Sequence, residues 1–223
     1  MYTGAEMKIS YNSKYGINDY LRCILSEIKN PVIFEIGAHN FRSGKKILNY
    51  CKGNFVYHGF EPDSRQNPSL RPSSKININR VAISNFDGYA PFYLSGGYTT
   101  AASSLKTPNK LFLDFRPTLE FNDTITVKVM KLDTYCLDKV DHIDFMWVDA
   151  QGSEYEIILG AQNILKNTKF IFMEYSHLLL YKNQFSLDCM LSALPGEWEL
   201  IHKFQREIAG DVLLQNKGIN YET

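Results

Sequence analysis

The 223-residue sequence lacks the features that mark several classes of protein. Its cysteines are few and scattered, at Cys23, Cys51, Cys136 and Cys189, so the close C-x-x-C pairs typical of structural zinc sites are absent. No apolar run reaches the roughly 20 residues that a membrane-spanning helix needs, and the N-terminus has no hydrophobic signal core. Free thiols and the absence of such segments predict a soluble, cytoplasmic protein with no membrane partner.

The sequence also lacks net charge, because 24 lysines and arginines balance 24 aspartates and glutamates. A neutral chain has no overall electrostatic attraction to nucleic acid, so we expect no nucleic-acid partner. Apolar residues are abundant, at 44% of the chain, which is enough for one hydrophobic core without disulfides. The composition leaves the oligomeric state open.

Short apolar runs alternate with helical patterns along most of the chain. Continuous apolar runs, typical of strands buried on both faces of a parallel sheet, lie at residues 32–36, 55–60, 76–83, 143–149 and 169–175. Helical spacing occurs at residues 17–29, 43–51 and 153–165. Residues 198–204 and 211–215 indicate an antiparallel hairpin. The pattern predicts a doubly wound α/β fold whose mostly parallel sheet closes with a C-terminal antiparallel hairpin.

The sequence predicts two parts of unequal length. Residues 1–30 are expected to form an N-terminal arm and a helix, and residues 31–223 the α/β domain. Within that domain residues 87–130 are less regular, with extended segments expected at residues 89–94 and 125–130 and loops at Gly96, Gly97 and residues 99–104. Because an irregular stretch of this length in a compact domain is often a lid, we assign residues 87–130 to substrate recognition.

Polar residues follow four of the predicted strands, where ligands of open α/β sheets bind. Gly37 follows the first strand and permits close approach of the backbone to a ligand. Glu61 follows the second and is suited to accept hydrogen bonds from both hydroxyls of a ribose. Ser84 ends the third, in a small apolar-to-polar turn suited to flank an adenine ring. Asp149 follows the fourth, ahead of a helix that Ser153 and Glu156 could begin with a capping box. Together the four strand ends predict a nucleoside-binding site.

Six segments in order resemble the FkbM family of methyltransferases. They are FEIGAHN (34–40), HGFEPD (58–63), RVAISNFDG (80–88), MKLDTYC (130–136), DFMWVDAQGSEYEIILGAQNIL (144–165) and FIFMEYS (170–176). The resemblance implies a class I, Rossmann-like methyltransferase fold with a seven-stranded sheet. It also implies an S-adenosylmethionine-dependent O-methyltransferase, which would act on a hydroxyl of a sugar, a glycan or another small molecule.

The resemblance also implies roles for individual residues. The residues that would line the methionine side of the cofactor are Glu35, Gly37, Ala38 and His39. Those beside the ribose would be Glu61 and Pro62, and those along the adenine Ala82, Ile83 and Ser84. Asp149 would lie beside the methyl-transfer centre. The residues that would border the substrate are Ser103, Ser104 and Gln151.

Two positions depart from the family pattern. Family members usually carry a second glycine shortly after the first, where this chain has Asn40 and Phe41. Their acidic loop usually reads D-V-E-G, whereas here Gln151 stands in place of the glutamate. Gln151 keeps the hydrogen-bonding capacity of a glutamate but not its charge.

Methyl transfer to an alcohol requires a base, because the hydroxyl loses its proton as it attacks. The candidates are Asp149, Glu174 and His177, of which histidine has the most suitable unperturbed pKa, near 6.5. Asp149 and Glu174 could also meet across adjacent strand ends and share a Mg²⁺ ion, an alternative that the sequence leaves open.

Other functions remain to be weighed. A dinucleotide-dependent oxidoreductase needs a G-x-G-x-x-G turn, but the next glycine after Gly37 is Gly44, which excludes that class. A catalytically degenerate methyltransferase fold that serves as a binding module is favoured by Phe41 and Gln151. An O-methyltransferase of a non-sugar molecule also remains open.

Overall fold

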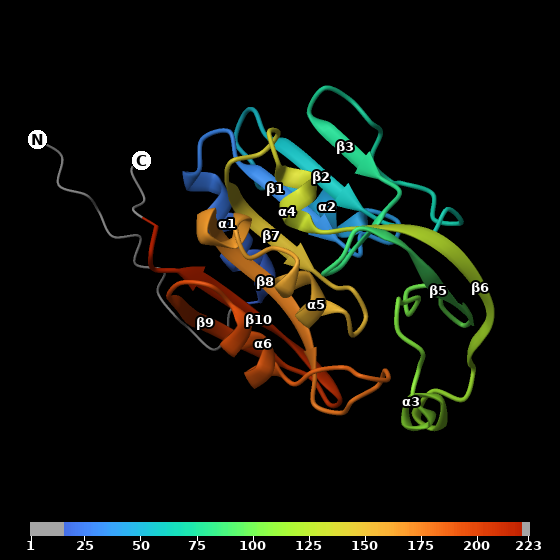
Figure 1. Ribbon diagram of the computed structural model, residues 1–223. Helices are drawn as coiled ribbons and strands as arrows, with labels where there is room; N and C mark the ends of the chain where they lie inside the picture. Colours follow the sequence, from blue (N-terminus) through green and yellow to red (C-terminus); the bar gives the residue numbers. More distant parts are fainter. Residues whose placement is uncertain (1–15, 220–223) are drawn as a thin grey trace, which may run out of the picture.

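The computed structural model describes residues 16–219 (Figure 1). Residues 1–15, in which most of the expected N-terminal arm falls, lie outside the described residues. The large sheet has the strand order β3 (Ile76–Asn79), β2 (Val56–Phe60), β1 (Val32–Ile36), β7 (Ile143–Val148), β8 (Thr168–Ser176), β10 (Ala209–Asn216) and β9 (Trp198–Gln205). Its first five strands run parallel, and β10 is antiparallel to both β8 and β9. The predicted seven-stranded sheet with its C-terminal hairpin is therefore confirmed.

Two layers of helices cover this sheet, as the double-sided burial of its strands requires. The helices are α1 (Ile17–Glu27), α2 (Arg42–Leu48), α4 (Leu132–Cys136), α5 (Glu154–Leu159) and α6 (Leu187–Ala193), with a 3₁₀ turn η1 at Ile164–Asn167, whereas α3 (Lys110–Phe115) lies outside these two layers. Adjacent residues of one strand face opposite layers: Ile33 packs with α1 and α2, whereas Phe34 packs with α4, α5 and α6. None of the helices between residues 16 and 219 is long and apolar enough to cross a membrane.

The apolar run 76–83, predicted as one strand, is two strands in different sheets. After β3 the chain turns at Arg80, whose guanidinium donates to the carbonyl oxygens of Asp63 (2.9 Å) and Gln66 (2.7 Å). The next strand, β4 (Ala82–Ile83), joins a small sheet instead. The predicted helix 153–165 is also shorter, because it ends at Gly160, which packs directly against the backbone of Ser84.

The segment 87–130 is more regular than its composition indicates. Its two long strands, β5 (Gly88–Gly97) and β6 (Leu119–Met130), pair antiparallel, and β4 completes the three-stranded sheet in the order β4-β6-β5. This small sheet and α3 extend to one side of the large sheet (Figure 1). The expectation of a loop at Gly96 and Gly97 was wrong, since both residues pair with β6. Residues 99–103 do form a connection without strand structure, and Ser104 forms an isolated antiparallel bridge with Tyr93.

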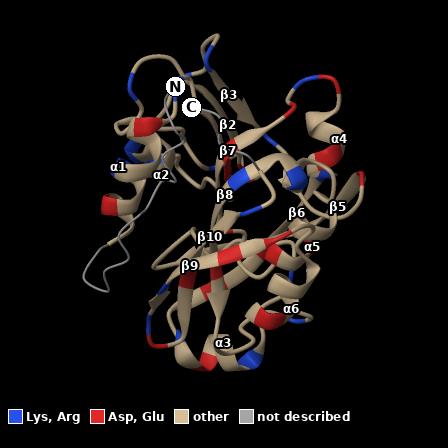
Figure 2. Ribbon diagram, turned by 90° about the vertical axis from the view of Figure 1, so that its left-hand side faces the viewer, with Lys and Arg blue, Asp and Glu red and all other residues tan. Residues whose placement is uncertain are grey.

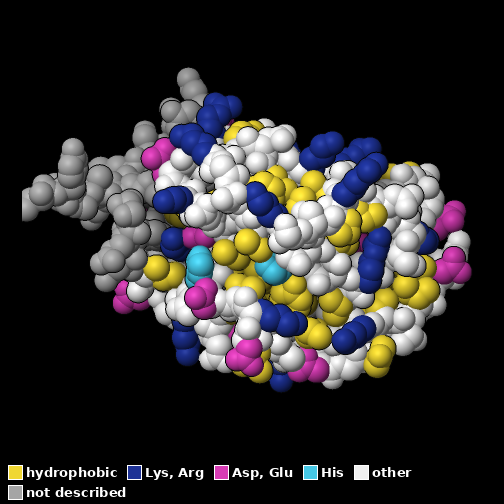
Figure 3. Space-filling model, turned by 90° about the horizontal axis from the view of Figure 1, so that it is seen from above, with side chains coloured by type: hydrophobic (Ala, Val, Ile, Leu, Met, Phe, Trp, Pro, Cys, Tyr) yellow, Lys and Arg dark blue, Asp and Glu magenta, His cyan; other side chains and the backbone are white. Residues whose placement is uncertain are grey.

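Charged side chains are interspersed over the ribbon, while the parallel strands are mostly uncharged (Figure 2). The neutral total nevertheless hides an uneven distribution. In residues 36–86 the only acids are Glu61 and Asp63, both buried, against eight lysines and arginines. The face seen from above accordingly carries more Lys and Arg than Asp and Glu side chains (Figure 3).

Candidate active site

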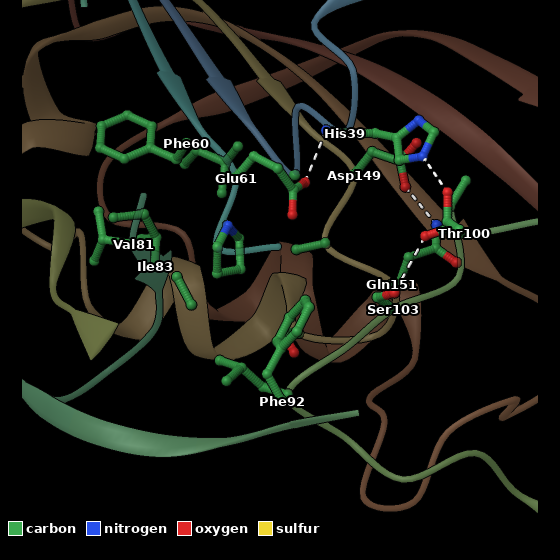
Figure 4. A pocket seen from close by; sticks show the side chains of 18 residues that line it. His39, Phe60, Glu61, Val81, Ile83, Phe92, Thr100, Ser103, Asp149 and Gln151 are labelled. Carbon is green, nitrogen blue, oxygen red and sulfur yellow. Dashed lines mark hydrogen bonds between the residues drawn. The ribbon is translucent and has the colours of Figure 1, made fainter. Parts of the chain in front are cut away.

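A cavity of about 520 Å³, its open mouth included, lies beyond the carboxyl ends of β1, β2 and β7 (Figure 4). This is the point at which the strand order of the large sheet reverses, β2 lying on one side of β1 and β7 on the other. Open α/β sheets bind their ligands at such a point.

The turn after β1 forms the floor of the cavity. The amides of Gly37 and Ala38 both donate to the carbonyl oxygen of Phe60 (3.0 Å), and the Asp149 amide donates to Ile36 (2.9 Å). Gly37 has φ +78°, and a Cβ there would overlap the carbonyl oxygen of Asp149. Only glycine therefore permits this close approach of the β1 and β7 ends.

Glu61, at the end of β2, presents a carboxylate to the cavity (Figure 4). Its two oxygens accept hydrogen bonds from the amides of His39 (2.8 Å) and Asp63 (2.8 Å), which fix the orientation of the carboxylate. Burial raises the pKa of Glu61 to about 7, although these two hydrogen bonds act in the opposite direction. Each oxygen keeps a further lone pair with which it can accept a hydrogen bond from a ligand.

The opposite wall is apolar and comes from β2, β4, β5 and the segment after β5. Its members are Phe60, Val81, Ala82, Ile83, Phe92 and Leu105. A wall of this kind can receive a flat, neutral ring.

The segment after β5 covers the cavity from the outside. Thr100 shares a hydrogen bond with the ring of His39 (2.8 Å between Oγ1 and Nε2). Arg65, which forms a salt bridge with Asp63 (2.8 Å), also donates to the carbonyl oxygen of Ser95 (3.1 Å). The small sheet is thus joined to the loops that follow β1 and β2.

A second hollow, of about 1,080 Å³ including open solvent, adjoins the first and shares Ala101 and Gln151 with it. Its lining contains aromatic side chains (Tyr98, Phe112, Tyr181) and charged ones (Arg116, Glu174, Arg206, Glu207). Gln151 therefore stands between the cavity and the hollow.

The side chain of Gln151 joins two carboxylates. Its Nε2 donates to Asp149 (2.6 Å) and to Glu174 (3.0 Å), and its Oε1 accepts from the Tyr181 hydroxyl (3.2 Å). Burial raises the pKa of both Asp149 and Glu174, and the charge of Asp149 raises that of Glu174 further. Arg206, 3.1 Å from Glu174, partly offsets this effect. An acid pair of this kind, lying where two hollows meet, is suited to hold or accept a proton.

Comparison with known proteins agrees with this geometry. Residues 35–206 match the family model described as the methyltransferase FkbM domain. The chain belongs to the FkbM methyltransferase family. It is 32% identical over 202 residues to the 2-O-methyltransferase NoeI of Sinorhizobium fredii (strain NBRC 101917 / NGR234), covering 86% of this chain and 82% of that protein. This FkbM protein is accordingly an S-adenosylmethionine-dependent methyltransferase.

Two solved structures are also similar. One is the N-terminal domain of EvdMO1 in the presence of S-adenosylhomocysteine and D-fucose, at 10% identity and a TM-score of 0.45, covering 91% of this chain and 83% of that one. The other is the precorrin-6y C5,15-methyltransferase of Geobacter metallireducens, at 9% identity and a TM-score of 0.41, covering 93% of each chain.

Most of the residues that the FkbM resemblance assigns to the cofactor line the cavity. They are Gly37, His39, Glu61, Pro62, Ala82, Ile83 and Asp149. Ser103 and Gln151, assigned to the substrate, also line it. Ala38 and Ser84 are buried beside the cavity but do not line it. Ser104 lies one layer behind, where its hydroxyl donates to the carbonyl oxygen of Gln151 (2.8 Å).

Glu35 and His177 are placed away from the cavity. Glu35 is 1% exposed and faces α2, where it accepts hydrogen bonds from the Gly44 amide (3.0 Å) and the Tyr57 hydroxyl. His177 is exposed and lies edge-on to Tyr175, with ring centroids 5.1 Å apart. It lines neither the cavity nor the hollow. Of the three candidate bases, Asp149 lines the cavity and Glu174 lines the hollow.

Phe41 does not line the cavity. Its φ is +61°, in the left-handed region that glycine prefers, and it precedes α2. Its ring is fully buried under α2 and lies against Gly59, where a Cβ would be 2.6 Å from the ring. The bulk that stands in place of the family's second glycine is therefore turned into the core.

Several lining residues were not among the predicted site residues, Thr100, Tyr181 and Ser153 among them. Thr100 falls in the predicted loop 99–104 and Tyr181 in the loop after β8, but no local pattern marks either residue by itself. Ser153 was interpreted as a helix cap. Its side chain makes no capping hydrogen bond, and Glu156 instead pairs with Lys106 (2.8 Å).

The sequence left open a Mg²⁺ ion shared by Asp149 and Glu174. The two carboxylates lie close together, but both accept a hydrogen bond from the side chain of Gln151. Between residues 16 and 219 no group of three His, Cys, Asp or Glu side chains is placed to hold a metal ion.

Proposed function

We propose that this FkbM methyltransferase transfers a methyl group from S-adenosylmethionine to a hydroxyl of a sugar or glycan. The observation that carries the proposal is the pair of adjoining hollows that meet at Asp149, Gln151 and Glu174. Two reactants can be held there with their reacting groups together, which is the main requirement of an in-line displacement. The relative NoeI, which by its name methylates an oxygen, supports the choice of a hydroxyl as acceptor.

The cavity fits the cofactor in its donor set. The Glu61 carboxylate, held by two amides, has lone pairs available for the two ribose hydroxyls. The apolar wall around Val81 and Ile83 suits the adenine, and the turn at Gly37 borders the methionine part. When bound, S-adenosylmethionine supplies a methyl group activated by a positive sulfonium.

The two acids, Asp149 and Glu174, have different roles. Glu174 lines the hollow, so it is the residue that can accept the proton of an acceptor hydroxyl. Its raised pKa makes it a stronger base than an ordinary carboxylate, and a positioned base contributes about 10²–10⁴-fold to rate. Asp149 lines the cavity, where its charge favours a positive donor. Gln151 keeps the two carboxylates in place.

The hollow has the mixed lining that sugars require. Aromatic side chains such as Tyr98 and Phe112 can stack on the apolar face of a sugar ring. Gln184 and Arg206 add polar groups for its hydroxyls.

The proposal is tested by incubating the purified protein with methyl-labelled S-adenosylmethionine and a panel of mono- and oligosaccharides. We expect label in at least one sugar, with mass spectrometry locating the methyl group on an oxygen. Glu174→Gln should reduce the rate by about 10²-fold or more, whereas Glu197→Gln, on the exposed surface, should not change it. Cofactor binding without transfer to any hydroxyl compound would support the degenerate binding module instead.

A further inference from the structure

The Ser153 hydroxyl is a buried polar group without a partner. The residue is 3% exposed and lines the cavity, yet its Oγ makes no hydrogen bond within residues 16–219. Buried polar side chains are nearly always hydrogen-bonded, because an unpaired one loses its interactions with water and gains nothing in return. A hydroxyl at this position therefore needs an explanation.

The hydroxyl has no local structural task. Ser153 occupies the position before α5 at which a serine side chain commonly caps the helix, but it does not do so. Glu154 satisfies the amides of this turn instead, its Oε1 accepting from Ala150 (2.9 Å) and Gly152 (3.3 Å). The Ser153 Oγ is consequently available to a molecule in the cavity.

The position of Ser153 on α5 indicates which part of the cavity it serves. Its carbonyl oxygen accepts from the amide of Ile157 (3.1 Å), one helical turn later, so both residues lie on the same side of the helix. Ile157 packs in one cluster with Val81 and Ile83, which belong to the apolar wall. Ser153 therefore adds a neutral hydrogen-bonding group to the wall that suits a flat ring.

We infer that Ser153 Oγ hydrogen-bonds the adenine edge of the bound cofactor and thereby contributes to selection of the base. A hydroxyl can either donate to a ring nitrogen or accept from the exocyclic amino group, so it can recognise adenine in either orientation. The inference rests on the proposed assignment of the cavity to S-adenosylmethionine.

The test compares Ser153→Ala with the wild type by calorimetry, using S-adenosylhomocysteine and then adenosine alone. We expect the variant to bind both ligands about three- to tenfold more weakly, by the same factor, since one neutral hydrogen bond is lost. The Tm of the ligand-free variant should be unchanged or higher, because the unpaired hydroxyl has been removed.

Ser186→Ala is the matched control. Ser186 does cap its helix, α6, by accepting from the Cys189 amide (3.4 Å), and it lines neither the cavity nor the hollow. We expect this variant to lose about 2–4 °C in Tm and to bind both ligands normally.

Three results would overturn the inference. If the wild type bound neither ligand, the assignment of the cavity to the cofactor would fail along with it. Equal affinities of Ser153→Ala and wild type would overturn the role of Ser153 alone. A loss of affinity for S-adenosylhomocysteine but not for adenosine would place the contact on the amino-acid part of the ligand and not on adenine.

Discussion

Replacing Glu35 with glutamine is expected to stabilise the protein at neutral and alkaline pH. Glu35 lies on β1, 1% exposed, and burial raises its pKa from an ordinary 4.5 to about 8 even though Tyr57 and Gly44 donate to it. A glutamine can keep both contacts, because its oxygen accepts from the Gly44 amide and its amino group donates to the Tyr57 oxygen. The substitution therefore removes the ionisable group from the core without leaving a polar group unpaired.

The size and sign of the effect follow from the two pKa values. Between pH 4.5 and 8 the folded protein holds a proton on Glu35 that the unfolded chain releases, so wild-type stability falls as the pH rises through this window. At about 1.4 kcal/mol per pKa unit, the loss reaches about 3 kcal/mol at pH 7. Glu35→Gln avoids it and should gain roughly 6–12 °C in Tm at pH 7, but almost nothing near pH 4.5.

Thermal unfolding followed by circular dichroism from pH 4.5 to 9 checks this expectation, with the exposed Glu197→Gln as control. Because Glu35 does not line the cavity, the variant should also bind S-adenosylhomocysteine within about twofold of the wild type. Parallel Tm profiles for Glu35→Gln and wild type would refute the argument from burial. A large loss of cofactor affinity would show instead that Glu35 serves the methionine side, as the family resemblance implies.

Further predictions concern the site itself. Gly37→Ala should abolish binding of S-adenosylhomocysteine in calorimetry, because a Cβ would overlap the Asp149 carbonyl; normal binding would contradict the close approach of β1 and β7. Glu61→Gln should weaken that binding by about tenfold or more, since hydrogen bonds to a charged group are worth about 1.5–3 kcal/mol; an unchanged Kd would remove Glu61 from the ribose site. His177→Ala should keep the wild-type rate within about twofold, because the ring lines neither hollow, and a tenfold loss would restore it as a candidate base. Activity should survive EDTA, because the amide of Gln151 already joins the two carboxylates; loss restored by Mg²⁺ would reverse this expectation.

The large sheet and the strand-end residues could be predicted because both depend on local pattern. A parallel strand buried on two faces must be continuously apolar, and ligands meet such sheets at the carboxyl ends of the strands. Gly37, Glu61 and Asp149 follow β1, β2 and β7 directly, so the order of the elements was enough to bring them together. Glu35 shows the limit of this reasoning: it lies within β1, where alternate side chains face opposite layers, and its side chain is directed to the α2 side.

The second hollow, which we propose to bind the acceptor, could not be predicted in the same way, because contacts between segments far apart in the sequence form it. The Tyr181 hydroxyl bonds to the carbonyl oxygen of Ala102 (2.8 Å), and the Asn109 amide bonds to that of Leu180 (2.8 Å). These contacts join segments about 70 residues apart or more, which no window of the sequence can contain. Residues 89–94 and 125–130 were predicted as extended, but their pairing as β5 and β6 was not, for a related reason: on the exposed small sheet polar and apolar residues mix, and the run of a buried strand is absent.

Phe41 shows how a protein can depart from a family motif and still keep the cavity beside it. The turn between β1 and α2 still requires a positive φ at this position, and Phe41 adopts +61° despite its Cβ, a conformation that costs energy for a bulky residue. The burial of the whole ring under α2 offsets that cost. The ring needs space on β2, which Gly59 provides, since a Cβ there would lie 2.6 Å from the ring. Family members have a glycine in the turn itself, whereas here Gly59 on the neighbouring strand leaves room for the Phe41 ring. The departure at Phe41 is therefore not evidence for a degenerate cofactor site.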